Sequence, residues 1–252
     1  LWLDFSYGEM CGEKWRATEL TRMVRALQPG ILLNSRLESS GGAYGSLMTD
    51  APSEISGDFT CPEMVIPTGG LHTPSGRSVP WECCTTLNNS WGYTAADNVY
   101  KSASTVVRKL VECVSKGGNL LINVGPDATG RIPERQRQIL ADVGQWMECN
   151  GESIYGCGAV DLPKPDWGRL TRRGHTLYAH VLEQPLGPIC LPKLRDRAQN
   201  VRLVADGREA FAVHSWVTFP YPDDLFLSLN QDGIATVLLP DTDTVLRFTL
   251  TK

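Results

Sequence analysis

The chain has 252 residues, of which 42% are hydrophobic and 21% are charged, a composition typical of globular proteins rather than of disordered or collagen-like chains. Its formal net charge is −4, so it lacks the basic field that holds nucleic acid or anionic lipid, and we expect neither nucleic acid nor a membrane as a partner. No apolar run approaches the roughly 20 residues that a membrane helix requires, and no targeting pattern decides between a cytoplasmic and a secreted location.

The apolar start of the chain predicts a buried strand over residues 1–3. Asp4 ends this run with a charge that costs several kcal/mol to bury without a partner, so a partner is expected nearby. The helical spacing of Leu20, Met23, Val24 and Leu27 predicts a short amphipathic helix in the stretch ATELTRMVRALQPG, which stops at Pro29 and Gly30. A second apolar run predicts another strand over residues 31–33.

A long segment rich in Gly, Ser and Pro follows, from Glu38 to Pro80. It is longer than most connections in compact domains, and long loops on a rigid scaffold tend to carry function. Further along the chain, the sequence predicts a strand near Glu82, a helix over residues 97–115, a strand over residues 119–123 and a third helix that starts at Pro133.

Strands alternate with helices in this region, and each strand is a nearly continuous apolar run. This pattern is typical of a parallel sheet covered on both faces, and it predicts an α/β fold that contains part of a (β/α) TIM-like barrel. A doubly wound sheet is the alternative, but it usually carries a Gly-rich phosphate loop after a strand, which this sequence lacks. In a barrel, polar residues at the carboxyl ends of the strands converge on one cleft, and here these residues are Asp4, Asn34, Arg36, Asn123 and Asp127.

The last third of the chain has a different sequence pattern. Short runs rich in β-branched and aromatic residues are separated by Gly, Pro and Asp, which predicts a small antiparallel β-sandwich. We therefore expect part of a barrel over residues 1–160 and a sandwich over residues 161–252. The runs that predict strands are TLYAHVL, NVRLV, ATVLLP and TVLRFTL.

Eight cysteines and four histidines are spread along the chain. No C-x-x-C pair occurs, and no histidine has the spacing to a cysteine that a zinc site requires. We expect reduced, packed thiols and no metal site.

Hydrolysis of a glycosidic bond requires two carboxyl groups, one on each side of the anomeric carbon. Asp4 is one candidate, although a structural ion pair with Arg36 would also explain it. Glu63 is the candidate for the second carboxyl group, because it lies in the long loop and follows a proline that restricts the backbone. Asp58 and Glu82 are rivals for that role, and most loop glutamates are simply solvated.

Aromatic residues accompany these carboxylates at the predicted strand ends. Trp2, Trp81 and Trp91 would suit the apolar faces of a sugar ring, and we assign them with Asp58 and Arg36 to the sugar-binding surface. Tryptophans at such positions are more often core residues. Their clustering with carboxylates favours the sugar-binding interpretation.

An ordered set of motifs resembles the catalytic domain of the family 29 α-L-fucosidases. The set spans roughly residues 1–156 and is specific because of its order, and the β-rich region that follows resembles that family's C-terminal sandwich more loosely. Members of the family are retaining exo-glycosidases that remove terminal fucose and need no metal or other cofactor, so the resemblance implies a fucosylated glycan as substrate. The motifs are LWLD, NSR, GDFTCPE, PWECCTTLNNSWGY, SKGGNLLINVGPDATGRIP and NGESIYG.

Carried over position by position, the resemblance implies that Asp4 is the nucleophile and that Glu63 is the acid/base. Arg36 would bond near the nucleophile and keep it ionised. Trp2 would line the sugar pocket, and Trp91 would pack against the fucose methyl group. Glu82 is the second candidate for the acid/base, as it has been in parts of that family.

The chain departs from the family because a complete barrel takes about 250 residues, and about 160 precede the sandwich here. The strand that ends at Asp4 corresponds to a middle strand of the barrel. We therefore expect a complementary barrel segment or a second copy of the chain as a partner. Two alternatives are a non-catalytic carbohydrate-binding remnant and a glycosidase for a different sugar.

Overall fold

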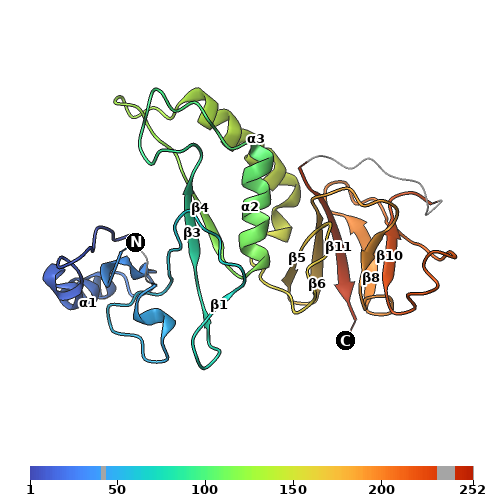
Figure 1. Ribbon diagram of the computed structural model, residues 1–252, viewed down its shortest axis with the longest axis horizontal. Coiled ribbons are helices and arrows are strands. Elements are labelled where there is room, and N and C mark those ends of the chain that lie inside the picture. The colour runs from blue at the N-terminus through green and yellow to red at the C-terminus, as the bar shows by residue number, and fades with distance from the viewer. Residues whose placement is uncertain (41–43, 232–241, 252) are drawn as a thin grey trace. The chain divides into compact units, whose positions relative to one another are not determined.

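The computed structural model describes residues 1–40, 44–231 and 242–251 (Figure 1). The chain divides into two compact units, which are described separately below. The first comprises Leu1–Thr86 and Gly117–Asn123, and the second comprises Leu87–Lys116 and Val124–Lys252. The division predicted from the sequence, at residues 160 and 161, stays a prediction.

In its described residues the first unit contains one α-helix, α1, at Ala17–Leu27, in the stretch where the sequence predicts a helix. Three 3₁₀ helices are η1 (Gly12–Trp15), η2 (Ser35–Leu37) and η3 (Ser46–Met48). The strands are β1 (Leu71–His72), β2 (Ser78–Val79), β3 (Glu82–Thr86) and β4 (Asn119–Asn123). The first two form an antiparallel pair, whereas β3 and β4 are parallel.

A parallel hydrogen-bonded array extends from β4 through β3 to segments that are not regular strands. Isolated parallel bridges join Glu63 to Cys84, Thr60 to Trp81 and Asn34 to Phe59. At the start of the chain, the amino group of Leu1 donates to the carbonyl of residue 32, and the amide of Asn34 donates to the carbonyl of Leu1. The segments predicted as strands at residues 1–3 and 31–33 therefore lie in this array, but they are too irregular to be strands.

A closed barrel is not present among the described residues. The prediction of an α/β fold with parallel strands is confirmed, whereas the barrel itself is not seen. Gly57 shows how closely the array is packed: it has a φ of +76°, and a Cβ at this position would lie 2.4 Å from the carbonyl oxygen of Asn34. Only glycine fits there, and this fixes the start of the loop that leads to Glu63.

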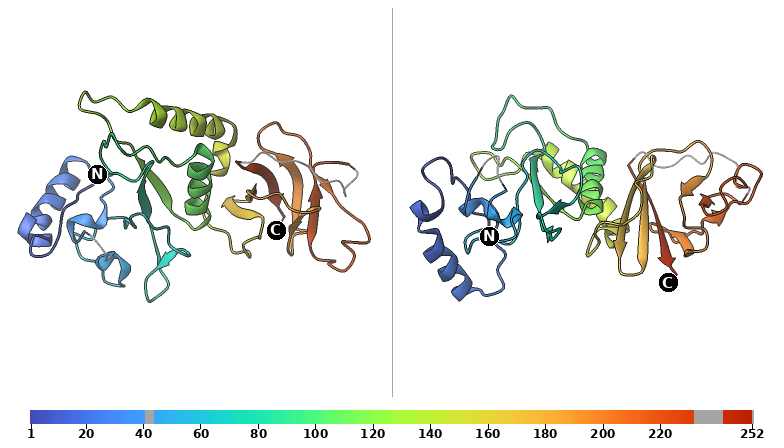
Figure 2. Two further views of the ribbon diagram at one scale, coloured as in Figure 1. Left: turned by 45° about the horizontal axis from the view of Figure 1, so that its top comes forward. Right: turned by 60° about the horizontal axis from the view of Figure 1, so that its bottom comes forward.

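The described part of the second unit combines two α-helices with two antiparallel sheets. The helices are α2 (Ala103–Ser115) and α3 (Glu134–Asn150), followed by η4 (Gly151–Ser153). The strands are β5 (Gly168–Arg173), β6 (Thr176–Val181), β7 (Ile189–Leu191), β8 (Ala198–Leu203), β9 (Phe211–Ala212), β10 (Leu225–Ser228) and β11 (Thr244–Leu250). Figure 2 shows these strands, coloured from yellow to red, gathered in one body.

The sheets have the strand orders β5-β6-β11-β8 and β7-β10-β9. Leu177, Leu246 and Phe248 of the first sheet belong to the same buried core as Leu191 and Leu227 of the second. A core shared by the inner faces of two antiparallel sheets is the architecture of a sandwich. The predicted strand at ATVLLP lies outside the described residues.

Residues at the start of each helix of the second unit explain where the helix begins. The hydroxyl of Ser102 accepts from the amide of Thr105 and caps α2, so this helix begins later than the sequence predicts, at Ala103. Pro133 precedes the first turn of α3, a position at which its missing amide hydrogen costs nothing. The two helices pack through a buried apolar cluster that includes Val107 and Val111. None of the helices that the structure describes is long and apolar enough to span a membrane.

Gly118 provides a test of the packing in the first unit. A Cβ at this position would lie 2.2 Å from the ring of Trp81, which is 1% exposed and unable to move aside. We expect Gly118→Ala to lower the free energy of unfolding by about 1–3 kcal/mol, measured by urea denaturation. Gly30→Ala is the matched control, because nothing lies within 4 Å of its added Cβ. Equal effects of the two substitutions would contradict this packing.

Candidate active site

Asp4 is positioned by a side chain that takes the place of a neighbouring strand. The amide of Leu3 donates to Oδ1 of Asn34 at 3.0 Å, and Nδ2 of Asn34 donates to the carbonyl of Leu3 at 3.0 Å. Asn34 is buried, so this pair of bonds fixes the backbone just before Asp4. The carboxylate is therefore held on an ordered backbone although no regular strand precedes it.

Arg36 joins the two leading carboxylate candidates. Its Nη1 lies 3.2 Å from Oδ1 and 3.3 Å from Oδ2 of Asp4, and its Nη2 lies 2.6 Å from Oε2 of Glu63. Its side chain is 6% exposed, compared with 33% for Asp4 and 41% for Glu63. The buried cation thus holds both carboxylates while it leaves each of them open to solvent.

The environment keeps Asp4 ionised. Burial acts to raise the pKa of its carboxyl group, but hydrogen bonds from the Phe5 amide and the Ser40 hydroxyl, together with the charge of Arg36, lower it below the ordinary value. A nucleophilic carboxylate has to be ionised, so this environment suits that role.

Glu82 lies in the same region through a different contact. Nε1 of Trp2 donates to Oε1 of Glu82 at 2.9 Å, and the guanidinium of Arg36 lies 5.0 Å from the centre of the Trp2 ring. Asp4, Glu63 and Glu82 are thus connected through Arg36 and Trp2. Of these three carboxylates, Asp4 follows a predicted strand and Glu63 lies in the long loop, whereas Glu82 begins β3, so strand carboxyl ends alone do not account for the cluster.

The backbone is strained immediately after both leading carboxylates. Phe5 has a φ of 70° and Met64 a φ of 58°, in the left-handed region that bulky residues avoid. Such residues cost about 1–3 kcal/mol each and cluster at functional sites, where the surrounding structure enforces them. Here the strained residues directly follow Asp4 and Glu63, so the strain accompanies the backbone that orients these two side chains.

Two predicted sugar-binding residues have structural contacts. Asp58 accepts from Nη2 of Arg25 at 3.0 Å and from the amide of Leu33 at 2.7 Å, so its carboxylate joins α1 to the parallel array. Trp81 is buried and packs against Gly118. These contacts give no support to a role in sugar binding for either residue, and that role stays a prediction.

The roles predicted for three other residues stay predictions. Trp91 is 44% exposed and belongs to the second unit. Asp127 belongs to the same unit and accepts from Thr129 and Arg131 in its own turn. Asn123 ends β4 in the first unit.

Ser40 contacts the nucleophile candidate and is not anticipated by the sequence. Its hydroxyl donates to Oδ1 of Asp4 at 2.9 Å. It lies in a run of small residues typical of any loop, so no pattern in the sequence distinguishes it.

The thiols near the cluster are not nucleophiles. Burial raises the pKa of Cys61 to about 12 and that of Cys84 to about 11, although the charge of Arg36 opposes this effect. Both thiols are therefore neutral at ordinary pH. All eight cysteines lie in the described part of the chain, and none of them forms a disulfide there.

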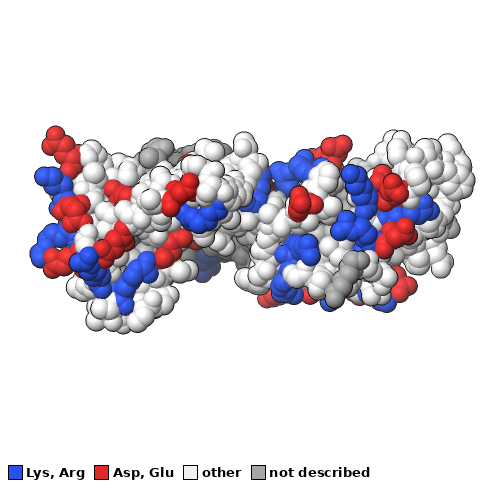
Figure 3. Space-filling view, turned by 90° about the horizontal axis from the view of Figure 1, so that it is seen from below, with Lys and Arg blue, Asp and Glu red and all other residues white. Residues whose placement is uncertain are grey.

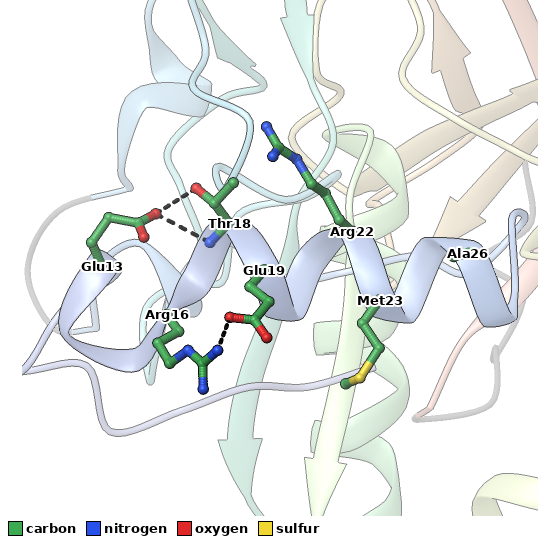
Figure 4. A pocket seen from close by; sticks show the side chains of 7 residues that line it. All are labelled: Glu13, Arg16, Thr18, Glu19, Arg22, Met23 and Ala26. Atoms are coloured by element: carbon green, nitrogen blue, oxygen red, sulfur yellow. Dashed lines mark hydrogen bonds and ion pairs between the residues drawn. The ribbon is translucent and has the colours of Figure 1, made fainter.

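No group of three or more His, Cys, Asp or Glu side chains that could hold a metal ion occurs within the described part of the chain. A shallow pocket lies on α1, but its charged side chains already have partners (Figure 4). Glu13 bonds Thr18, Arg16 pairs with Glu19, and Arg22 pairs with Glu54. On the face drawn in Figure 3, acidic and basic side chains are interspersed, without a large area of one sign.

A model of the α-L-fucosidase family matches residues 1–152, which include the whole Asp4, Arg36 and Glu63 cluster. The chain belongs to the α-L-fucosidase family. Glycoside hydrolase family 29 is the classification of these enzymes, and the resemblance inferred from the motifs is confirmed.

Known α-L-fucosidases resemble the chain over most of its length. The plasma α-L-fucosidase of Rattus norvegicus is 41% identical over 196 residues, which cover 67% of this chain and 42% of that protein. The structure of α-L-fucosidase isoenzyme 1 from Paenibacillus thiaminolyticus is 48% identical with a TM-score of 0.92, and the match covers 100% of this chain and 57% of that one.

A more distant α-L-fucosidase, from Bacteroides thetaiotaomicron, shares the fold at 23% identity with a TM-score of 0.74, over 94% of this chain and 53% of that one. The chain thus spans about half the length of the α-L-fucosidases that it matches.

The pKa of Asp4 tests the geometry of this α-L-fucosidase cluster. The pKa of Asp4 is lower in the folded state than in the unfolded state, where it has its ordinary value of about 3.9. The ionised carboxylate therefore stabilises the fold at any pH above this ordinary value, and this stabilisation is lost as the pH falls through the lowered pKa. We expect Arg36→Met to raise the pH at which the Asp4 carboxyl carbon titrates, measured by ¹³C NMR.

Arg22→Met is the control, since it removes an exposed ion pair with Glu54 and should leave the titration of Asp4 unchanged. Arg36→Lys keeps the charge and should give an intermediate titration if Arg36→Met does not fold. Identical titration curves for the parent chain and both Arg36 variants would contradict the described pairing.

Proposed function

We propose that the chain supplies the catalytic carboxylates of a retaining α-L-fucosidase that releases terminal α-L-fucose from glycans. The observation that carries the proposal is the pairing of Asp4 and Glu63 through one buried guanidinium, within the residues that the family model matches. Two carboxyl groups close together, one of them kept ionised, are what a double displacement at an anomeric carbon requires.

In the first step, Asp4 attacks the anomeric carbon and the bond to the leaving oxygen breaks, while the carboxyl group of Glu63 protonates that oxygen. In the second step, Glu63 takes a proton from water, the water oxygen bonds to the anomeric carbon, and the bond to Asp4 breaks. The structure of the Bacteroides enzyme contains a trapped covalent intermediate formed with 2-fluoro-fucosyl fluoride in a Glu-to-Gln mutant, which supports this scheme.

Arg36 has a role in both steps. Since it donates to both carboxylates, it sets their separation, which has to be about 5–5.5 Å for retention. We assign Trp2 and Arg36 to the wall of the fucose pocket, and Trp91 to the methyl group of fucose. Asp58 and Trp81 would contribute to sugar binding only indirectly, through the residues that they contact.

Glu82 is the alternative acid/base. Its Oε1 accepts from the Trp2 indole, whereas Glu63 is held by the same side chain that holds Asp4. The connection to Asp4 through Arg36 favours Glu63 as the acid/base. Glu82 then orients the Trp2 side chain.

A further segment is proposed to complete the barrel, either a complementary polypeptide segment or a second copy of the chain. The first unit exposes many large apolar side chains, which a soluble surface rarely leaves uncovered. They include Leu1, Phe5, Tyr7, Met10, Met23, Leu27, Leu32, Met64 and Val65. The match covers 57% of the Paenibacillus chain, and a segment that corresponds to the rest of that chain would suit this role.

The decisive test uses the chain assembled with the part of the Paenibacillus enzyme that it does not cover, and that enzyme split in the same way is the positive control. We expect Asp4→Gly to lower turnover of an aryl α-L-fucoside about a thousandfold or more, because the nucleophile is lost. Added azide should restore part of the activity and yield fucosyl azide.

Asp161→Gly, at an exposed position, is the matched control and should retain activity. A 2-fluoro-fucosyl fluoride should label the peptide that contains Asp4, as measured by mass spectrometry. An active Asp4→Gly variant would refute the assignment. Fucose binding without turnover or label would favour the non-catalytic alternative, and preference for another aryl glycoside would favour a different sugar.

Light scattering and binding of a hydrophobic dye test the completing segment. We expect the chain alone to self-associate and bind the dye, and the complementary segment to abolish both effects by covering the apolar side chains. The proposal of a completing segment would be excluded if the chain by itself were monomeric, bound no dye and were fully active. An active dimer would show that the completing segment is a second copy of the chain.

A further inference from the structure

The two oxygens of Asp4 have different surroundings. Oδ1 accepts from three donors: the amide of Phe5 at 2.8 Å, the hydroxyl of Ser40 at 2.9 Å and Nη1 of Arg36 at 3.2 Å. Among the described residues, Oδ2 accepts from Arg36 alone, at 3.3 Å. The lone pairs of Oδ1 are therefore engaged, and those of Oδ2 are available for a reaction.

The hydroxyl of Ser40 has a defined direction. It accepts from the amide of Ser6 at 3.1 Å, and its single hydrogen has two acceptors in reach, Oδ1 of Asp4 at 2.9 Å and the carbonyl of Arg36 at 3.3 Å. The bond to the carboxylate is shorter and charge-assisted, so it takes the hydrogen.

Ser40 is also fixed by its own backbone. Its amide donates to the carbonyl of Ser6 at 2.8 Å, and the Ser6 hydroxyl donates to the carbonyl of Leu37 at 3.1 Å. Ser40 is 8% exposed, and water does not compete well for its hydroxyl. These contacts join the segment around Asp4 to the loop after η2 and support the left-handed backbone of Phe5.

We propose that Ser40 is a positioning residue that holds Oδ1 of Asp4 and thereby makes Oδ2 the oxygen that bonds to the sugar. The proposal rests on the function proposed above. In the first step, a lone pair of Oδ2 forms the bond to the anomeric carbon, and the leaving oxygen departs with the electron pair of its own bond and the proton of Glu63. In the second step, water replaces Oδ2, its proton goes to Glu63, and the electron pair returns to Asp4.

Ser40 then favours the second step. In the covalent intermediate, Oδ1 is the carbonyl oxygen of an ester, and negative charge returns to the carboxylate as the ester breaks. A donor fixed on Oδ1 stabilises that charge where it develops. The same donor stabilises the free carboxylate before the first step, so it does not accelerate the attack.

Among the described residues, the charged and titratable groups that face Asp4 are Arg36 and, through Arg36, Glu63. Both are unchanged in a Ser40 variant, so a shift in the titration of Asp4 in that variant reports the lost hydroxyl.

The test compares Ser40→Ala with Ser40→Thr, which keeps the hydroxyl, and with Ser39→Ala as the matched control. Ser39 is the adjacent residue, and its hydroxyl bonds the carbonyl of Ser40 rather than Asp4. Two measurements are made: the ¹³C NMR titration of Asp4 in the chain itself, and kcat and KM for an activated aryl fucoside in the assembled enzyme.

We expect Ser40→Ala to raise the pH at which Asp4 titrates. We also expect it to lower kcat about tenfold, because one hydrogen bond to a charged group is lost. KM should fall in parallel because the covalent intermediate accumulates, and kcat/KM should change little. Ser40→Thr should restore both values, and Ser39→Ala should resemble the parent chain.

An unmoved titration of Asp4 in Ser40→Ala overturns the proposal whatever the activity of the assembled enzyme. A lower kcat with an unchanged KM also overturns it, because the covalent intermediate would then not accumulate. Failure of the proposed function is visible separately, in the chain with Ser40 intact, as activity that survives Asp4→Gly.

Discussion

The buried guanidinium of Arg36 is the constraint on which the candidate site depends. It donates through Nη1 to Asp4 and through Nη2 to Glu63, and it lies beside the ring of Trp2. A buried cation without partners would be unstable, and two carboxylates this close would repel each other, so the three groups require one another. The arrangement fixes the two carboxylates in space at the same time as it offsets their charge.

The backbone around the cluster serves the same geometry. Parallel pairing aligns the segments that end in Asp4, Arg36 and Glu63, and it continues into β3 and β4, which are regular strands. Left-handed residues follow both carboxylates, and side chains such as Asn34 hold the irregular segments where regular strand bonds are lacking. The local strain is thus compensated by contacts that also aim the reactive groups.

The second unit has a well-defined buried core. The sandwich encloses a continuous core between its two sheets, and it also buries a hydrogen bond between Nδ1 of His180 and Oδ2 of Asp243, which lie 2.8 Å apart. Burial raises the pKa of that aspartate, although His180 opposes the shift. Large apolar side chains are exposed in both units, among them Trp216 and Phe219 of the second, and Phe5 of the first unit is exposed directly after Asp4. The exposed apolar side chain beside a reactive carboxylate is why the site is proposed to need a further segment.

The sequence by itself determined the family, the helices and the identity of the candidate carboxylates. Helix α1 and the strand β4 follow from local periodicity and turn residues, which depend on neighbours in the chain, and the order of the motifs is a property of the sequence alone. Only the tertiary structure decided that residues 1–3 and 31–33 are irregular, that Arg36 joins Asp4 to Glu63, and that Asp58 pairs with Arg25. It also decided the contact of Ser40 with Asp4, which no pattern of small loop residues encodes. The physical reason is that hydrogen bonds and ion pairs between distant segments depend on distances in space, whereas periodicity and turn chemistry depend on residues that are close in the chain.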